Sequence, residues 1–465
     1  MNIKHLKTFL LILFVLKSFV INAQFTTLKN FSGNDGGGYG SLTYLNGKLY
    51  GTTNYGGTSG NGYIYSISTN GTNFTILHNF NIFSSYPCGS LLHDNGVLYG
   101  MTFGNIYKIN IDGTGYTVLH NFAYNNSNNG SKPYGSLIIS GTILYGMTRN
   151  GGATAIDGLD GAGVIFKINT NGTNFTILHS LGWGEHYPYG SLIVKDNFLY
   201  GMSSLEGSNS GIIFKMNING TNFTILHTFN GVNGSTPNGN LVLSNNTLYG
   251  MTARGGNTNG NVRKGNVFKI NIDGTGFQSI FNDLNGSVYY SWSYGSLVLV
   301  GNVLYGKSNR NIYSLNTDGS NYQWYNWSLY GYAINSYEPQ ENGNLVYGDG
   351  ALFGCNRFGG ANDQGVVYKF SPSNLGDEGI VNTTEIKLYP NPTNDEITID
   401  CGNLDNVSGW SIKIVNMLGQ EVFNGIMNTQ LYDISTQTWD NKGVYFAKIY
   451  DGSNNLILTK KIILK

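Results

Sequence analysis

Residues 135–179, GSLIISGTILYGMTRNGGATAIDGLDGAGVIFKINTNGTNFTILH, decide the fold. Four short segments rich in β-branched and aromatic residues alternate with turns rich in glycine and asparagine. This pattern predicts strands at residues 136–139, 143–148, 164–169 and 175–179. No helix fits the spacing of the apolar residues. The stretch is therefore predicted to form one four-stranded antiparallel sheet.

The same unit recurs along the chain. A Gly-Ser/Asn-Leu motif starts seven times, at Gly40, Gly89, Gly135, Gly190, Gly239, Gly295 and Gly343. The second strand of each unit repeats Leu-Tyr-Gly, with its aromatic residue at Tyr50, Tyr99, Tyr145, Tyr200, Tyr249, Tyr305 and Phe353. Motifs roughly 50 residues apart fit the repeat length of four-stranded propeller blades. We predict an all-β fold in which residues 24–371 form a seven-bladed β-propeller.

The two ends of the repeat region complement each other. After Tyr368 the last copy has no fourth strand, whereas residues 25–28, Phe-Thr-Thr-Leu, resemble a fourth strand that precedes the first copy. Pairing of this N-terminal strand with the last blade would close the ring and remove open strand edges, which invite aggregation.

The N-terminal residues indicate export. Lys4 and Lys7 precede an apolar run over residues 9–16, and Ala23 ends a cleavage-type sequence, so residues 1–23 are predicted to be a signal peptide. The apolar run is shorter than the ~20 residues of a spanning helix, and we expect no transmembrane segment in the mature chain. The net charge of zero gives no reason to expect a nucleic-acid partner.

Leu-Tyr-Gly-Met/Thr-Thr, followed by Gly56-Gly57 in the first copy and by Gly163-Val164-Ile165-Phe166-Lys167-Ile168 in the third, resembles the GloVer tandem-repeat family over residues 25–370. Copies six and seven depart from the pattern at Lys307 and Cys355. The resemblance implies a secreted repeat architecture and no defined chemistry.

A second domain follows a linker at residues 372–384. Residues 385–465 alternate apolar and polar residues as in a small β-sandwich. Their ordered motifs resemble the type A sorting domain of the type IX secretion system: Tyr389-Pro390-Asn391-Pro392, a Leu-Gly turn at Gly419, Gly443-Val444-Tyr445-Phe446, and Lys460-Lys461. The resemblance implies the type IX machinery as a partner and an extracellular or cell-surface location. The alternative is an ordinary adhesion-type sandwich.

Candidate ligand-binding residues lie on one face of the predicted propeller. The long loops leading into the first strand and joining the second to the third emerge together, and rigid scaffolds carry function on such loops. Four arginines follow the Leu-Tyr-Gly segments there: Arg149, Arg254, Arg310 and Arg357. Guanidinium groups pair bidentately with carboxylates and sulfates, so acidic polysaccharide is the expected ligand class. Alternatively, each arginine bonds carbonyls of its own loop.

A second group on these loops combines aromatic and polar residues: Trp183, Glu185, His186, Tyr187 and Trp292. The tyrosines before the first strands are interpreted as packing residues, with sugar stacking as the alternative. The histidines at the end of the fourth strands, His78, His120, His179 and His227, are interpreted as structural because successive blades separate them too widely for one metal ion. The Asp157–Gly161 turn suggests calcium only weakly. We expect no cofactor and no metal.

The sequence favours a non-catalytic binding propeller that recognises glycans or surface partners. It contains no nucleophile elbow, zinc-binding His-Glu-x-x-His or phosphate loop. A polysaccharide hydrolase or lyase is the alternative, using carboxylates near the long loops: Glu185, Glu206, Asp283, Glu338, Glu341 and Asp363. A structural envelope protein is the third possibility.

Overall fold

The computed structural model describes residues 24–32, 35–84, 86–122, 129–152, 161–182, 184–185, 187–205, 210–256, 265–282, 295–307, 311–326, 343–357, 359–372, 386–401, 409–416, 420–429, 431–439, 442–450 and 456–464. The predicted signal peptide, residues 1–23, lies outside them. The contacts divide the chain into two compact units, and the division falls between Ser373 and Asn374. We call them unit 1 and unit 2.

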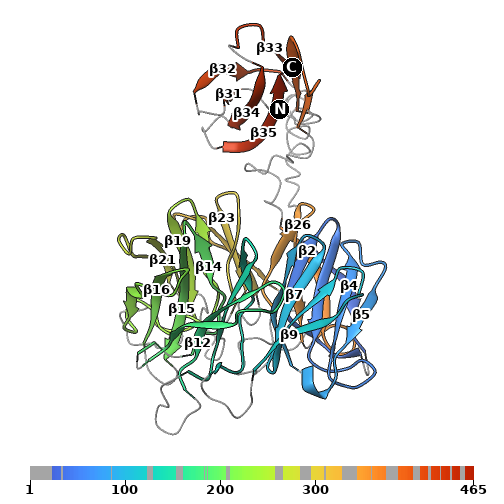
Figure 1. Ribbon diagram of the computed structural model, residues 1–465, viewed down its shortest axis with the longest axis vertical. Helices are drawn as coiled ribbons and strands as arrows, with labels where there is room; N and C mark the ends of the chain where they lie inside the picture. The colour runs from blue at the N-terminus through green and yellow to red at the C-terminus, as the bar shows by residue number, and fades with distance from the viewer. Residues whose placement is uncertain are drawn as a thin grey trace, which may run out of the picture. The chain divides into compact units, whose positions relative to one another are not determined.

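The described part of unit 1 is built from four-stranded antiparallel sheets, numbered here in chain order (Figure 1). Short 3₁₀ turns such as η2 (Ile82–Ser84) are its helical elements. Sheet 1 contains β2 (Gly38–Leu45), β3 (Lys48–Thr53), β4 (Tyr63–Ser68) and β5 (Thr75–Asn79). Sheet 2 contains β6 (Pro87–Asp94), β7 (Val97–Thr102), β8 (Asn105–Asn110) and β9 (Thr117–Asn121). Sheet 3 contains β10 (Ile138–Ser140), β11 (Ile143–Thr148), β12 (Val164–Asn169) and β13 (Thr176–Ser180).

The remaining sheets of unit 1 repeat this order. Sheet 4 contains β14 (Ile193–Lys195), β15 (Phe198–Leu205), β16 (Ser210–Asn217) and β17 (Thr224–Phe229). Sheet 5 contains β18 (Val242–Ser244), β19 (Thr247–Thr252), β20 (Asn266–Asn271) and β21 (Gln278–Asn282). Sheet 6 contains β22 (Val298–Val300), β23 (Val303–Lys307), β24 (Asn311–Asn316) and β25 (Gln323–Asn326). Sheet 7 contains β26 (Val346–Gly348), β27 (Ala351–Asn356), β28 (Val366–Ser371) and the N-terminal strand β1 (Gln24–Asn30).

The connections at the two ends of a sheet differ in length most clearly in sheet 3. In sheet 3, residues 141–142 join β10 to β11 and residues 170–175 join β12 to β13, whereas residues 149–163 join β11 to β12. The short turns carry their own hydrogen bonds: the backbone N–H of Thr173 donates to Asn171 Oδ1 (3.0 Å), and Gly172 between them has φ +89°. We call the end with the long connections the long-loop face.

The glycine of Leu-Tyr-Gly allows the third strand to carry a large ring. Gly146 on β11 lies opposite Phe166 on β12, and a Cβ atom at Gly146 would collide with that ring. Buried side chains of neighbouring sheets then form shared clusters, as where Tyr99 and Met101 of sheet 2 pack with Leu144 and Phe166 of sheet 3. The repeated motif therefore encodes packing both within and between sheets.

Sheet 7 packs against sheet 1. Phe353 and Val367 of sheet 7 share one cluster with Leu49 and Tyr65 of sheet 1, and the orange and blue strands lie side by side in Figure 1. The interfaces between sheets 1 and 2, 2 and 3, 3 and 4, 4 and 5, and 5 and 6 have equivalent clusters. The side chain of Lys307 joins sheets 6 and 7.

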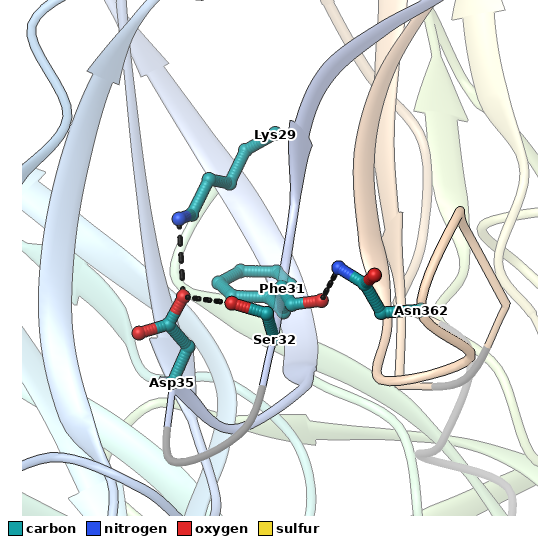
Figure 2. Close-up of polar contacts among 5 residues, drawn as sticks. All are labelled: Lys29, Phe31, Ser32, Asp35 and Asn362. Carbon is teal, nitrogen blue, oxygen red and sulfur yellow. Dashed lines mark hydrogen bonds and ion pairs between the residues drawn. The ribbon is translucent and has the colours of Figure 1, made fainter.

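The N-terminal strand β1 pairs with β28, as the sequence predicted. Figure 2 shows how the end of β1 is fixed: Asn362, from the loop before β28, donates from Nδ2 to the carbonyl oxygen of Phe31 (3.0 Å). Lys29 and Ser32 both bond to Asp35 Oδ2, at 3.1 and 3.4 Å. The first described residues thus complete the last sheet of unit 1.

A row of stacked side chains links successive sheets near the ends of the fourth strands. The ring centroid of His78 lies 3.7 Å from that of Tyr116 in the next sheet, and the ring centroid of His227 lies 3.6 Å from that of Phe277. Both pairs of rings are nearly parallel. Lys29 occupies the same position in β1 and places its Nζ 4.8 Å from the Phe74 ring centroid. Burial lowers the pKa of His227 to about 4, so this ring is neutral at physiological pH. In the structure the histidines act as packing residues.

Unit 2 consists of two antiparallel sheets. One contains β29 (Lys387–Tyr389), β30 (Glu396–Asp400) and β33 (Leu431–Ser435). The other has the order β32 (Glu421–Met427), β31 (Trp410–Asn416), β34 (Gly443–Tyr450) and β35 (Leu456–Leu464). Both sheets contribute to one buried cluster, with Ile397 and Ile434 from the first and Ile412 and Ile449 from the second. Unit 2 is therefore all-β with its own core.

Candidate binding site

A ring of polar side chains runs through the seven sheets of unit 1. We call it the polar ring; its members follow the motif glycines and are Ser41, Ser90, Ser136, Ser191, Asn240, Ser296 and Asn344. The backbone N–H of Ser136 donates to Ser191 Oγ (2.7 Å), and the N–H of Ser191 donates to Asn240 Oδ1 (2.7 Å). The N–H of Asn344 in sheet 7 donates likewise to Ser41 Oγ in sheet 1 (2.9 Å). This bonding explains why serine or asparagine recurs here, a role that sequence reasoning missed.

Six of the seven members of the polar ring, all except Ser90, line a small cavity of about 40 Å³. Tyr134, Tyr189 and Asn238 also line it, and Asn238 Oδ1 is a buried acceptor with no hydrogen-bond partner among the described residues. Such a volume holds a few water molecules, whereas pockets for organic ligands reach several hundred Å³. A sugar would therefore have to bind outside the cavity.

Arg149 lies at the long-loop face beside this cavity, held among three tyrosines. Its Nε donates to Tyr189 Oη (2.8 Å), and one terminal nitrogen donates to Asn150 Oδ1 (3.2 Å). Its Cζ lies 4.6 Å from the ring centroid of Tyr187, 5.3 Å from that of Tyr189 and 5.8 Å from that of Tyr134. Aromatic faces attract a guanidinium group and fix its plane. Arg149 is thus a pre-positioned cation that is half-buried.

The aromatic contacts continue from Tyr134 away from Arg149. Tyr134 contacts Phe103 (5.2 Å between centroids), and Phe103 stacks on Tyr86 (5.5 Å). Tyr86 is 52% exposed, whereas Tyr187 and Tyr189 are buried. Tyr187 and Tyr189 therefore position Arg149, and Tyr86 offers a free aromatic surface on the same face.

In each of four consecutive sheets, sheets 2 to 5, a residue with a strained backbone precedes the proline that leads into the first strand. These residues have φ between 51° and 60° and are Tyr86, Lys132, Tyr187 and Thr236. A left-handed conformation is unfavourable for a residue before proline and for a β-branched residue such as Thr236. In sheet 3 the carbonyl oxygen of Lys132 accepts the N–H of Arg149 (3.0 Å). Recurrent strain of this kind clusters at functional sites. The sequence gives no sign of this strain.

Arg254 occupies a different position from Arg149. Ser131 bridges Asn150 in sheet 3, and Ser235 bridges Arg254 in sheet 5, so Arg254 corresponds to Asn150. Because successive side chains of an extended strand point to opposite sides, Arg254 and Arg149 face different ways. The two arginines thus do not occupy equivalent sites.

Arg357 follows Phe353 of its second strand at the same sequence spacing as Arg149 follows Tyr145. Its Cζ lies 5.7 Å from the Tyr55 ring centroid. The structure does not bring Arg357 and Arg149 together, since they belong to sheets 7 and 3. Arg310, Trp183, His186 and Trp292 lie outside the described residues.

The described acidic residues among the catalytic candidates, Glu185 and Asp363, form hydrogen bonds within their own loops. Glu185 Oε2 accepts the N–H of Gly182 (3.0 Å) and contacts His179 Nε2 (3.1 Å). Asp363 Oδ1 accepts the N–H of Gly359 (2.9 Å). Glu206, Asp283, Glu338, Glu341 and the acidic residues of the Asp157–Gly161 turn lie outside the described residues. Within the described part of the chain, no group of three metal-ligating side chains occurs.

Lys307 is a buried cation at the junction of sheets 6 and 7, where most copies have methionine. Its Nζ donates to the carbonyl oxygens of Gly343 (2.7 Å) and Cys355 (3.3 Å) and to Asn356 Oδ1 (3.0 Å). It is 4% exposed, and burial lowers its pKa to about 8. The departures at Lys307 and Cys355 noted in the sequence therefore meet across one interface. Cys355 is buried, as are the other two cysteines, and all three are free thiols.

The sorting-motif residues lie on three strands of unit 2 and the loop after β29. Tyr389 ends β29 and is 44% exposed, while Gly443 begins β34. Lys460 and Lys461 lie in β35. Asn391 contacts that strand through its side-chain amide. Gly419 lies outside the described residues.

Three overlapping matches to the family model of the Gloeobacter/Verrucomicrobia repeat cover residues 14–155, 102–262 and 152–324. The chain belongs to the Gloeobacter/Verrucomicrobia repeat family. Residues 387–465 match the secretion system C-terminal sorting domain. Both resemblances seen in the sequence are confirmed. The sorting domain marks this Gloeobacter/Verrucomicrobia repeat protein for export to the cell surface or the extracellular space. In its described part, no helix has the length and apolar character of a membrane-spanning segment.

Individual relatives of this repeat protein are distant. An endo-acting ulvan lyase of Formosa agariphila is 28% identical over 89 residues, which is 19% of this chain and 16% of the lyase. An oligogalacturonate lyase solved with manganese has a TM-score of 0.51 at 12% identity, over 76% of this chain and 98% of that one. PorZ, a surface component of the type IX secretion system of Porphyromonas gingivalis, has a TM-score of 0.46 at 14% identity, over 94% of this chain and 60% of PorZ. The likeness to the oligogalacturonate lyase is one of fold.

Proposed function

We propose that this protein is an exported, non-catalytic propeller that binds acidic polysaccharide at its long-loop face through Arg149. In this proposal residues 1–23 are a cleaved signal peptide and residues 24–371 form the propeller. Residues 372–384 link it to the sorting domain at residues 385–465. The observation that carries the binding proposal is the guanidinium of Arg149, fixed among three tyrosine rings beside the polar ring.

The packing of sheet 7 on sheet 1 supports a closed ring of seven blades. Each sheet contacts the next, and the N-terminal strand belongs to the same sheet as the last repeat. The polar ring follows the same order, including the bond from Asn344 to Ser41. In such a ring the long-loop face forms one rim of a central channel.

The chemistry around Arg149 suits a sugar that carries negative charge. A guanidinium group forms short, charge-assisted hydrogen bonds to carboxylate or sulfate oxygens. Lys132 pairs with Arg149 through its backbone and adds a second positive charge to this rim. The exposed Tyr86 offers an apolar face against which a sugar ring can pack. Together these groups favour an acidic over a neutral polysaccharide.

The test is a binding titration of the purified full chain with dextran and dextran sulfate, which differ in sulfate groups, and with polygalacturonate. We expect binding to the two acidic polymers and not to dextran. Arg149→Gln should weaken the acidic binding at least tenfold, because one charge-assisted hydrogen-bonding group contributes roughly 1.5–3 kcal/mol. Added salt should weaken it further, because charges near the surface are screened.

Lys48→Gln is the matched control, because Lys48 is an exposed cation at the short-turn end of sheet 1. It should leave affinity unchanged within about twofold. Equal losses for Arg149→Gln and Lys48→Gln would reduce the interaction to nonspecific charge attraction. Absence of binding to every acidic polymer would refute the proposed function.

A polysaccharide lyase or hydrolase remains the second candidate, favoured by the short alignment with the ulvan lyase. The described carboxylates argue for the binding role, since Glu185 and Asp363 both accept backbone N–H groups of their own loops. Release of new reducing ends from polygalacturonate or ulvan by the purified chain would establish the enzyme instead.

A further inference from the structure

Asn391 of the Tyr-Pro-Asn-Pro segment is bonded to the last strand of the chain. Its Nδ2 donates to the carbonyl oxygen of Lys461 (2.7 Å), and its Oδ1 accepts the N–H of Ile463 (2.9 Å). One side-chain amide therefore satisfies two backbone groups of β35, as a neighbouring strand would. Asparagine is suited to this because its amide carries both a donor and an acceptor.

The backbone after Asn391 continues the same contact. The N–H of Thr393 donates to the carbonyl oxygen of Ile463 (2.9 Å), and Thr393 forms a parallel bridge with Leu464. β35 lies at the edge of its sheet, with β34 on its other side. Residues 391–393 thus cover the outer edge of β35 near the C-terminus. We call these three residues the clasp.

The clasp is anchored in the opposite sheet of unit 2. Thr393 is buried, and its Oγ1 donates to the carbonyl oxygen of Glu396, which begins β30. The N–H of Thr436, after β33, donates to the carbonyl oxygen of Asp395 (2.8 Å), and Thr436 Oγ1 donates to that of Asn394 (3.1 Å). The clasp therefore ties the C-terminal strand of one sheet to the body of the other.

We propose that Asn391 is a positioning residue for export: it holds the C-terminal strand against the sorting domain, and the secretion machinery recognises that strand in its clasped form. This inference rests on the sorting-domain assignment and is independent of the proposed polysaccharide binding. An uncovered strand edge can pair with other chains. The clasp fixes residues 461–464 in one defined arrangement, which the secretion machinery can recognise.

The geometry allows the clasp to be broken without unfolding the domain. Asn391 is exposed, and an exposed hydrogen bond contributes little to global stability. Asn391→Asp keeps an acceptor for the N–H of Ile463 but replaces the donor to Lys461 by an oxygen. Two oxygens would then face each other at hydrogen-bond distance, and residues 461–464 should detach from Asn391 while they stay paired with β34.

The experiment expresses the full chain in a host with type IX secretion and measures the fraction exported. For Asn391→Asp we expect at least a fivefold loss of exported protein. Amide hydrogen exchange of the purified chain should rise tenfold or more at residues 461–464, while the melting temperature of unit 2 changes little.

Two control variants separate positioning from stability. Asn424→Asp makes the same chemical change at an exposed position of β32, away from the clasp, and should be exported normally. Met427→Ala removes a fully buried side chain and should lower the melting temperature while sparing the clasp. Export of Met427→Ala above that of Asn391→Asp supports the proposal. Normal export of Asn391→Asp with a detached strand would overturn it, as would export that simply follows melting temperature.

Discussion

Replacement of Gly135 by alanine is expected to destabilise unit 1 strongly. Gly135 lies against the backbone of Gly190, and a Cβ atom there would overlap the carbonyl oxygen of Gly190. Gly190 lies in turn against Gly239, so neither backbone can move aside without disturbing the next sheet. A backbone overlap in a closely packed interior costs about 3 kcal/mol or more.

Gly141→Ala provides the control for this variant. Gly141 lies in the turn between β10 and β11 at φ +60°, and no atom lies within 4 Å of a Cβ built there. Its substitution should cost only about 1 kcal/mol, from the left-handed backbone alone. Denaturant unfolding of both variants measures the difference. Equal stability of Gly135→Ala and Gly141→Ala would contradict the close approach of the Gly135 and Gly190 backbones.

Replacement of Lys307 by methionine is expected to stabilise unit 1 at pH 7. Burial lowers the pKa of Lys307 from the ordinary 10.5 to about 8, which makes the charged form costly in the folded state by about 3 kcal/mol. Methionine occupies the same position in sheets 2 to 5 and introduces no charge. The three lost hydrogen bonds, at roughly 0.5 kcal/mol or more each, offset part of this cost, so the net gain is at most about 2 kcal/mol.

The advantage of Lys307→Met should disappear at high pH. Between pH 8 and 10.5 the unfolded chain binds a proton at Lys307 that the folded chain has released, so wild-type stability rises with pH across this window. The measurement is the difference in unfolding free energy between the wild type and Lys307→Met, determined by denaturant unfolding at pH 7 and at pH 10. Tyrosine titrations affect both proteins equally and cancel in this difference. A stability difference that does not change with pH would contradict the lowered pKa of Lys307.

Met251→Lys tests whether the acceptors around Lys307 matter. Met251 holds the corresponding position in sheet 5 and is 1% exposed. The Sδ atom of the uncharged Met251 side chain accepts a hydrogen bond from the hydroxyl of Tyr313 (3.4 Å), so burial of a lysine ammonium group there should destabilise unit 1 by about 3 kcal/mol or more. A neutral effect would show that any position of this kind tolerates an ammonium group.

Strand positions could be predicted from the sequence because each copy carries the pattern within a few residues. In sheet 3, β11 and β12 have the predicted bounds, because β-branched and aromatic residues end at clear glycine and asparagine turns. β10 begins at Ile138 rather than at residue 136, and the backbone N–H of Ser136 bonds to Ser191 of the next sheet. Contacts between copies leave no such local pattern.

The candidate site was predictable only in part for the same reason. Arg149 and Arg254 were grouped because both follow Leu-Tyr-Gly, yet a shift of one residue places them on opposite sides of the chain. The tyrosines before the first strands were interpreted as packing residues, and Tyr189 is one, but its hydroxyl also holds Arg149. Glu185 was a candidate because of its loop, and the structure shows it bonded within that loop.

The most direct test of the binding site is an amide hydrogen-exchange footprint of the full chain with and without a saturating acidic polysaccharide. Binding at Arg149 should protect residues 129–135 and 147–152, around Lys132 and Arg149, with no change at the short turn of residues 170–175 at the opposite end of sheet 3. Protection confined to the short-turn end, or to unit 2, would contradict a polysaccharide site at Arg149.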